Sequence, residues 1–219
     1  MFTVKQSSRL ARALMVATVL ASASACVSDE ERSGPRAATS EDIWRLSGTK
    51  DAVSNLQQAL SDACHVSLTS PDGYQKISPE GDSCVRTHMV VAFDAQEGSL
   101  LCGRDKGLQP FVSCILEGQF VGHVVANSGS DRLAPEVQWG GGEERSKQAA
   151  NLLSERVKAS CATPDQAALK KCVDETMLRA FEVDEKAVDF CPTPQQRDLC
   201  IYWAGFARSI RIKLERIGA

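Results

Sequence analysis

The cysteines restrict the fold of this chain more than any other feature of its sequence. Nine cysteines occur in 219 residues, so at least one of them has no disulfide partner within the chain. Setting Cys26 aside leaves eight, which follow one another as Cys64 and Cys84, Cys102 and Cys114, Cys161 and Cys172, and Cys191 and Cys200. In an oxidising compartment all eight can pair. The sequence therefore predicts a fold stapled by four disulfides.

A pattern that recurs around these cysteines indicates which of them pair. Val85, Ile115, Val173 and Ile201 each follow the second cysteine of a successive pair directly. The last two units also share a Thr-Pro-x-Gln-x-x-Leu segment after their first cysteine. This repetition favours disulfides within each unit, which requires the chain after Cys161 to double back along its helix. The alternative is a helical hairpin, with Cys161 bonded to Cys200 and Cys172 to Cys191.

Hydrophobic periodicity predicts that the mature chain is mainly α-helical. Apolar residues recur at helical spacing over 51–63, 80–96, 108–126 and 143–160. Two further helices should begin near residues 164 and 194, where Thr163 and Thr193 are candidate N-caps and Pro164 and Pro194 suit the first turn. Segment 108–126 could instead form two strands, because it is rich in Val, Ile and Phe and contains Gly118. Its 3.6-residue stripe favours the helix.

The segment 127–142 divides the predicted helices into two groups. It contains four glycines and a proline, a composition that no helix tolerates throughout. We therefore predict two cysteine-rich helical halves, residues 41–126 and 143–219, each with four cysteines. Within the second half, residues 161–200 resemble small envelope domains of the lysozyme-inhibitor type. No functional residue can be transferred from that resemblance.

The N-terminus has the features of an export signal. Lys5, Arg9 and Arg12 precede an apolar run over 13–21, which is too short for a permanent membrane span. Small residues then lead to Cys26. Residues 1–26 resemble a bacterial lipoprotein signal, and the resemblance implies that Cys26 is lipidated after removal of residues 1–25. Ala23 stands where a leucine is usual, so cleavage after Ala25 without lipidation, which would release a soluble protein, stays open.

The region after the signal predicts where the protein resides. Residues 26–40 are polar, and we expect a lipidated cysteine followed by a flexible tether. Val27 follows the cysteine where an aspartate would imply retention in the inner membrane. The resemblance thus implies a periplasmic protein anchored to the outer membrane. Without residues 1–25, 22 basic residues oppose 28 acidic ones, a balance that argues against nucleic acid as a partner.

Candidate chemistry is limited to three histidines that lie near cysteines. His65 follows Cys64, His88 stands four residues after Cys84, and His123 is on the 108–126 segment. No C-x-x-C, nucleophile elbow or phosphate loop is present, so we predict no cofactor, no metal and no catalytic residue. The expected function is non-catalytic binding of an envelope protein or a glycan. The alternative is a small periplasmic enzyme or metal-binding protein using these histidines.

Overall fold

The computed structural model describes residues 38–70, 73–103, 107–129, 133–139, 142–191 and 193–217. The regular elements of these residues are all helical, which confirms the predicted fold class. The α-helices are α2 (Ser40–Leu46), α3 (Thr49–Cys64), α4 (Pro79–Ala92), α5 (Gln96–Leu101), α6 (Leu108–Asn127), α7 (Pro135–Trp139), α8 (Gly142–Ser160), α9 (Gln166–Ala180) and α10 (Arg197–Leu214). Short 3-10 helices, η2 (Glu185–Val188) and η3 (Pro194–Gln196), precede α10. The predicted signal peptide and Cys26 lie outside the described residues.

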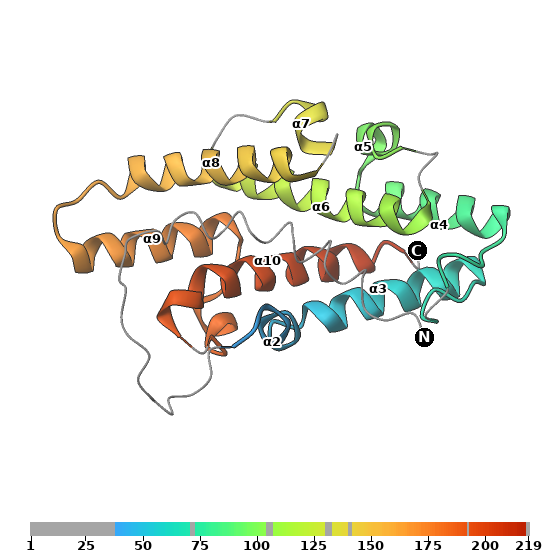
Figure 1. Ribbon diagram of the computed structural model, residues 1–219, viewed down its shortest axis with the longest axis horizontal. Coiled ribbons are helices and arrows are strands. Elements are labelled where there is room, and N and C mark those ends of the chain that lie inside the picture. The colour runs from blue at the N-terminus through green and yellow to red at the C-terminus, as the bar shows by residue number, and fades with distance from the viewer. Residues whose placement is uncertain are drawn as a thin grey trace, which may run out of the picture.

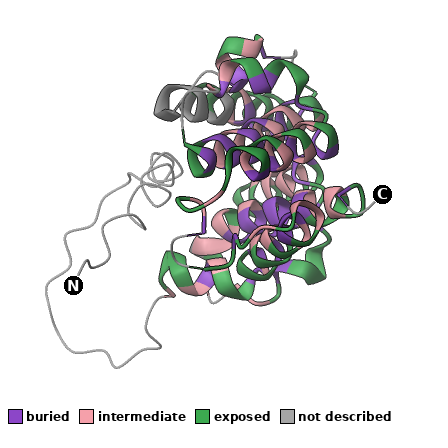
Figure 2. Cartoon of the chain, turned by 90° about the vertical axis from the view of Figure 1, so that its right-hand side faces the viewer, coloured by how far each residue is buried: buried purple, intermediate pink, exposed green. Residues whose placement is uncertain are grey.

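The long helices are arranged in two layers. Figure 1 shows α4, α6 and α8 along one side, with the short helices α5 and α7 over their outer face. Helices α3 and α10 lie side by side in the other layer, and α9 packs against α6, α8 and α10. Buried residues follow the faces that the helices turn toward one another (Figure 2). None of the helices in the described ranges has both the length and the apolar character that a bilayer crossing requires.

One hydrophobic core extends over both predicted halves of the chain. It contains buried residues from Ile43 in α2 to Ile217 after α10. Within this core, the Phe120 ring of α6 has its centroid 5.7 Å from that of Phe181, 5.1 Å from that of Tyr202 and 5.2 Å from that of Phe206. Helix α6 belongs to 41–126, whereas its three aromatic partners belong to 143–219. The two segments therefore bury their apolar faces against each other.

Segment 108–126 is the helix α6, as the 3.6-residue stripe predicted. Helix α7, which lies within the predicted linker, packs closely against two glycines of α6. A Cβ atom at Gly118 would come within 2.2 Å of the Trp139 ring, and one at Gly122 within 2.3 Å of the Gln138 side chain. The Gln138 amide also donates a hydrogen bond of 2.9 Å to the Gly118 carbonyl. The residues that weaken a helix thus let a second helix approach its backbone.

Two helix starts differ from the predicted capping boxes. Helix α9 begins at Gln166, and its N-cap is Asp165, which accepts a hydrogen bond of 2.6 Å from the Ala168 backbone. An ionised carboxylate is a stronger acceptor than a threonine hydroxyl, so Asp165 replaces Thr163 as the cap. Before α10, Thr193 makes no hydrogen bond to a backbone N–H of η3. Its hydroxyl donates instead to the Gln196 side chain over 3.2 Å.

The predicted helix over 80–96 ends early, at Ala92. Asp94 adopts a left-handed conformation with φ of 50°, and the chain turns into α5. Lys213 and Arg216, from the C-terminal part of the chain, donate hydrogen bonds of 2.9 and 2.6 Å to the Asp94 carboxylate. Asp tolerates the left-handed region better than most residues, and the two cations hold it there. Both partners of the residue at this break lie more than a hundred residues away in the chain.

The same contacts make the stability contribution of Asp94 dependent on pH. Hydrogen bonds from Lys213 and then Arg216 lower the pKa of its carboxyl in the folded state. The contribution is therefore present above the unfolded pKa of about 4 and is lost as the pH falls through the lowered folded value. We expect Asp94→Asn to destabilise the protein by about 0.5 kcal/mol at neutral pH, because the carboxylate is largely exposed and solvent screens the ion pairs.

The measurement is urea denaturation of parent and Asp94→Asn protein at neutral and at acidic pH. The two unfolding free energies should converge as the pH falls, and the difference at neutral pH should shrink in high salt. Asn keeps the shape of the side chain and also tolerates the left-handed region, so a backbone effect is not added. A difference that persists unchanged at acidic pH would contradict the ion-pair explanation.

The structure joins the eight cysteines within their successive units. Cα–Cα distances are 5.7 Å for Cys64–Cys84, 5.7 Å for Cys102–Cys114, 5.5 Å for Cys161–Cys172 and 6.0 Å for Cys191–Cys200. All are within the range that a disulfide can bridge. The connection after α8 doubles back into α9, as pairing between Cys161 and Cys172 requires (Figure 1). The hairpin alternative, with Cys161 bonded to Cys200, is not the one formed.

Candidate functional site

A hollow on α4 contains the strongest candidate site in the described residues. Ser78 caps this helix by accepting a hydrogen bond from the Gly81 backbone, and Pro79 occupies its first turn. Glu80, Cys84 and His88 follow at intervals of four residues, which places them on one face of a helix. That face lines an open hollow of about 580 Å³, together with Pro79, Ser83 and Thr87.

The disulfide Cys64–Cys84 fixes the end of α3 against this face. Cys64 is the last residue of α3, and His65 ends the helix in a left-handed conformation with φ of 52°. Three apolar residues within about one helical turn of these cysteines are fully buried: Leu60 in α3, and Val85 and Met89 in α4. The position of the two sulfurs is therefore determined by helix packing as well as by the covalent bond.

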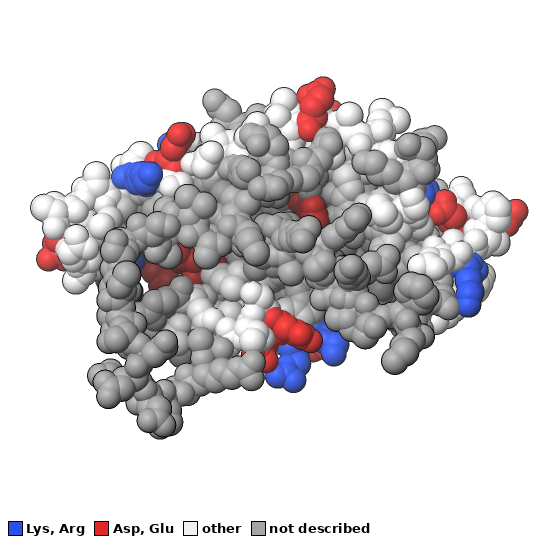
Figure 3. Space-filling model, viewed as in Figure 1, with Lys and Arg blue, Asp and Glu red and all other residues white. Residues whose placement is uncertain are grey.

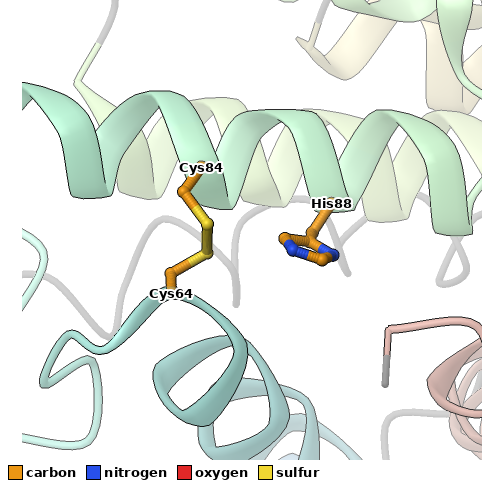
Figure 4. Close-up of side chains that lie close together, drawn as sticks. All are labelled: Cys64, Cys84 and His88. Atoms are coloured by element: carbon orange, nitrogen blue, oxygen red, sulfur yellow. A yellow bond between two sulfur atoms is a disulfide. The ribbon is translucent and has the colours of Figure 1, made fainter. Parts of the chain in front are cut away.

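His88 lies beside the bridge. The sulfurs of Cys64 and Cys84 and a ring nitrogen of His88 all lie within 4.8 Å of one another, and all three residues are half-buried. Figure 4 shows the imidazole on the same side of α4 as the Cys84 side chain. No other group of three candidate metal ligands is this close within the described part of the chain. While the disulfide is intact its sulfurs are not thiolates, which are the form that binds metal.

Glu80 adds a negative charge to the hollow. A hydrogen bond from its own backbone N–H, and a second one with Ser78, lower the pKa of its carboxyl. The carboxylate is thus ionised at neutral pH. Together with the hydroxyls of Ser83 and Thr87 and the imidazole of His88, it gives the hollow both hydrogen-bond donors and acceptors. This combination suits a polar ligand.

A second polar cluster joins α6, α10 and the end of α9. Glu182, which has φ of 50°, accepts a hydrogen bond of 3.2 Å from Asn127 and lies 3.5 Å from the His123 ring nitrogen. Arg208 of α10 donates to the same carboxylate. The Asn127 side-chain nitrogen Nδ2 also lies 2.9 Å from Nε2 of His123. These contacts tie three elements together at the surface and include no nucleophile, so their chemistry is that of a polar clamp.

The three histidines are therefore divided among different environments. His88 adjoins the disulfide, His123 belongs to the polar clamp, and His65 is exposed at the end of α3. The structure does not bring them into one group with a carboxylate. Sequence inspection missed Glu80 as a member of the hollow and Glu182 as the partner of His123. The four-residue interval from Glu80 to Cys84 could have revealed the first, whereas the second has no local signal.

Charged side chains elsewhere on the surface are mixed in sign. Figure 3 shows acidic and basic groups interspersed over the described part of one face. Leu46, Val91, Leu100 and Ile212 are the large apolar side chains that stand most exposed among the described residues. They occur on four different helices, α2, α4, α5 and α10. None of these features concentrates one type of chemistry as the hollow on α4 does.

Over the described residues, fold and site together define a class: a helical protein stapled by four local disulfides, with an open hollow beside one of them. Comparison with protein-family models, with curated proteins and with solved structures found no match for the chain.

Proposed function

We propose that the protein is an exported lipoprotein, anchored to the outer membrane through Cys26, that acts as a non-catalytic binding module in the cell envelope. The observation that carries this proposal is the pairing of the other eight cysteines in four disulfides. Cys26 is then the one cysteine without a partner in its own chain. A lipid on its sulfur gives this residue a function that does not require a second thiol.

The disulfides support export on physical grounds. Structural disulfides persist in oxidising compartments and are rare where thiol reductants are abundant. Here each bridge closes a loop of only 9 to 20 residues between neighbouring helices. Such bridges fix the relative positions of neighbouring helices. A protein of this kind is suited to present a fixed surface.

The hollow on α4 is the part of that surface that we assign to the partner. Its lining of Glu80, Ser83, Thr87 and His88 is polar and open, and can exchange hydrogen bonds with a glycan or with the polar surface of an envelope protein. No nucleophile with an oriented base is present in it. Binding is therefore better supported than catalysis.

The anchoring half of the proposal is tested by Cys26→Ala. The parent should fractionate with the outer membrane and carry an N-terminal acyl group by mass spectrometry, because a lipid-modified cysteine partitions into the bilayer. The variant should lose the acyl group and leave the membrane fraction. An intact, unacylated Cys26 in the parent would contradict lipidation, and a soluble parent cleaved after Ala25 would support the secreted alternative.

The binding half is tested by photo-crosslinking in cells that produce the parent protein. A photo-crosslinking residue is placed at one position of the hollow. Thr87 is the site, since it is exposed and lines the hollow. Lys171, which is exposed on α9, is the matched control. We expect a discrete adduct from position 87 and none from position 171. If both positions give the same adducts, or position 87 gives none, the hollow is not the partner-binding surface.

A further inference from the structure

We propose that reduction of the Cys64–Cys84 disulfide converts this end of α3 and α4 into a binding site for Zn²⁺, with Cys64, Cys84 and His88 as its three protein ligands. The three donor atoms already lie within 4.8 Å of one another (Figure 4). Two thiolates and one imidazole are a ligand set that zinc prefers. This inference concerns the purified chain and does not depend on the anchoring proposed above.

The required change in geometry is small. In a tetrahedral site with Zn–S distances of about 2.3 Å, two sulfurs lie about 3.8 Å apart. The sulfurs must therefore separate by roughly 2 Å from the length of a covalent S–S bond. Cys64 is the last residue of α3, directly before the left-handed His65, so its side chain is at the point where the chain leaves the helix. His88 needs no new backbone position, because it is one helical turn beyond Cys84 on the same face.

Exposure distinguishes this disulfide from the other three. Each of the others contains a cysteine that is almost fully buried, namely Cys102, Cys161 or Cys200. Cys64 and Cys84 are both half-buried, and Cys84 lines the open hollow. Neither cysteine of this bridge is fully buried, and exposed disulfides are the more readily reduced ones. We expect this bridge to be reduced first.

The reductant is a dithiol, which supplies two electrons and two protons. Its first thiolate attacks one sulfur, the Cys64–Cys84 bond breaks, and a mixed disulfide forms with one cysteine of the protein. The second thiolate then displaces that cysteine and closes a disulfide in the reductant. Cys64 and Cys84 are left as thiols, and binding of Zn²⁺ releases their two protons to the solvent. Three protein ligands would leave one position of a tetrahedral zinc site for water.

The local fold does not depend on the bridge alone. Helix α3 packs against α4, and Leu60, Val85 and Met89 are fully buried in the core that both helices share, so we expect the two helices to stay in contact after reduction. The bound metal then restores a link between the same two helix positions. The site is thus expected to alternate between a covalent link and a metal link, according to the supply of dithiol and of zinc.

The test begins with limited reduction of the purified full chain carrying Cys26→Ser, which removes the ninth thiol. Differential alkylation and peptide mapping should find label first at Cys64 and Cys84. Titration with Co²⁺, used as a spectroscopic probe for zinc, should then give thiolate charge-transfer absorption and tetrahedral ligand-field bands, at one ion per chain. Oxidised protein is expected to give neither. Label that appears first in another disulfide, or absence of the thiolate band, would overturn the proposal.

Two histidine variants make the assignment specific. His88→Ala should weaken Co²⁺ binding by about tenfold or more, because one of three ligands is lost. His65→Asn is the matched control: this exposed histidine adjoins Cys64, and Asn tolerates its left-handed conformation. Circular dichroism of both variants is the check that they are folded. Equal Co²⁺ affinity in parent and His88→Ala protein would refute the site.

Discussion

Complete reduction of all four disulfides is expected to unfold the protein at neutral pH and ambient temperature. In the chain-entropy description, a bridge stabilises by about 3.3 kcal/mol for a separation of 20 residues and about 2.6 kcal/mol for 9 residues. The four loops follow one another along the chain without overlap, so their contributions add. Their sum, about 11 kcal/mol, is as large as the whole net stability of an ordinary domain.

Circular dichroism during a urea titration measures this effect. The oxidised protein should show a cooperative transition, and the fully reduced and alkylated chain should have lost most of its helical signal before urea is added. Limited reduction that opens only Cys64–Cys84 is the control, and it should leave the transition in place at a lower urea concentration. A fully reduced chain that unfolds at the same urea concentration as the oxidised one would show that the disulfides contribute little.

Phe120→Ala should cause the largest loss of stability among single side-chain truncations of the aromatic cluster, about 4 kcal/mol. Phe120 is only 2% exposed, and its ring contacts Phe181, Tyr202 and Phe206. Truncation of a buried Phe removes transfer free energy and leaves a cavity, and the lost aromatic pairs add to that. Because these contacts connect 41–126 with 143–219, the whole protein should respond in one transition.

Two controls isolate the cause in equilibrium unfolding experiments. Phe120→Leu keeps most of the volume and removes the ring contacts, so a loss of about 1.5 kcal/mol is expected. Leu100→Ala removes a side chain that is 72% exposed and should change the unfolding free energy by less than about 0.5 kcal/mol. Two separate transitions, only one of them shifted by Phe120→Ala, would contradict a core shared by the two segments.

The helices that the sequence predicted were those with long, regular apolar stripes. The predicted span 108–126 is the helix Leu108–Asn127, and 143–160 is Gly142–Ser160. A long apolar stripe marks a helix face that must be buried, and it can be recognised from the spacing of neighbouring residues alone. Short helices have no such stripe. Helix α7, at Pro135–Trp139, was predicted as linker because five residues are too few to show a period.

The cysteine order also had predictive value. Pairing within units follows from a repeated local arrangement, and the structure closes these four loops. The caps were less predictable. Thr163 and Asp165 are both good N-cap residues two positions apart, so residue type alone does not single out Asp165, which caps α9.

Local sequence patterns thus predicted the long helices and the disulfide framework, and they support an expectation of export. Which polar groups meet depends on tertiary packing. Asp94 pairs with Lys213 and Arg216, and His123 with Glu182, across separations that carry no local signal. The position of His88 beside Cys64 likewise depends on how α3 packs on α4. Periodicity and capping are properties of neighbouring residues, whereas these contacts arise only when a shared core brings distant helices together.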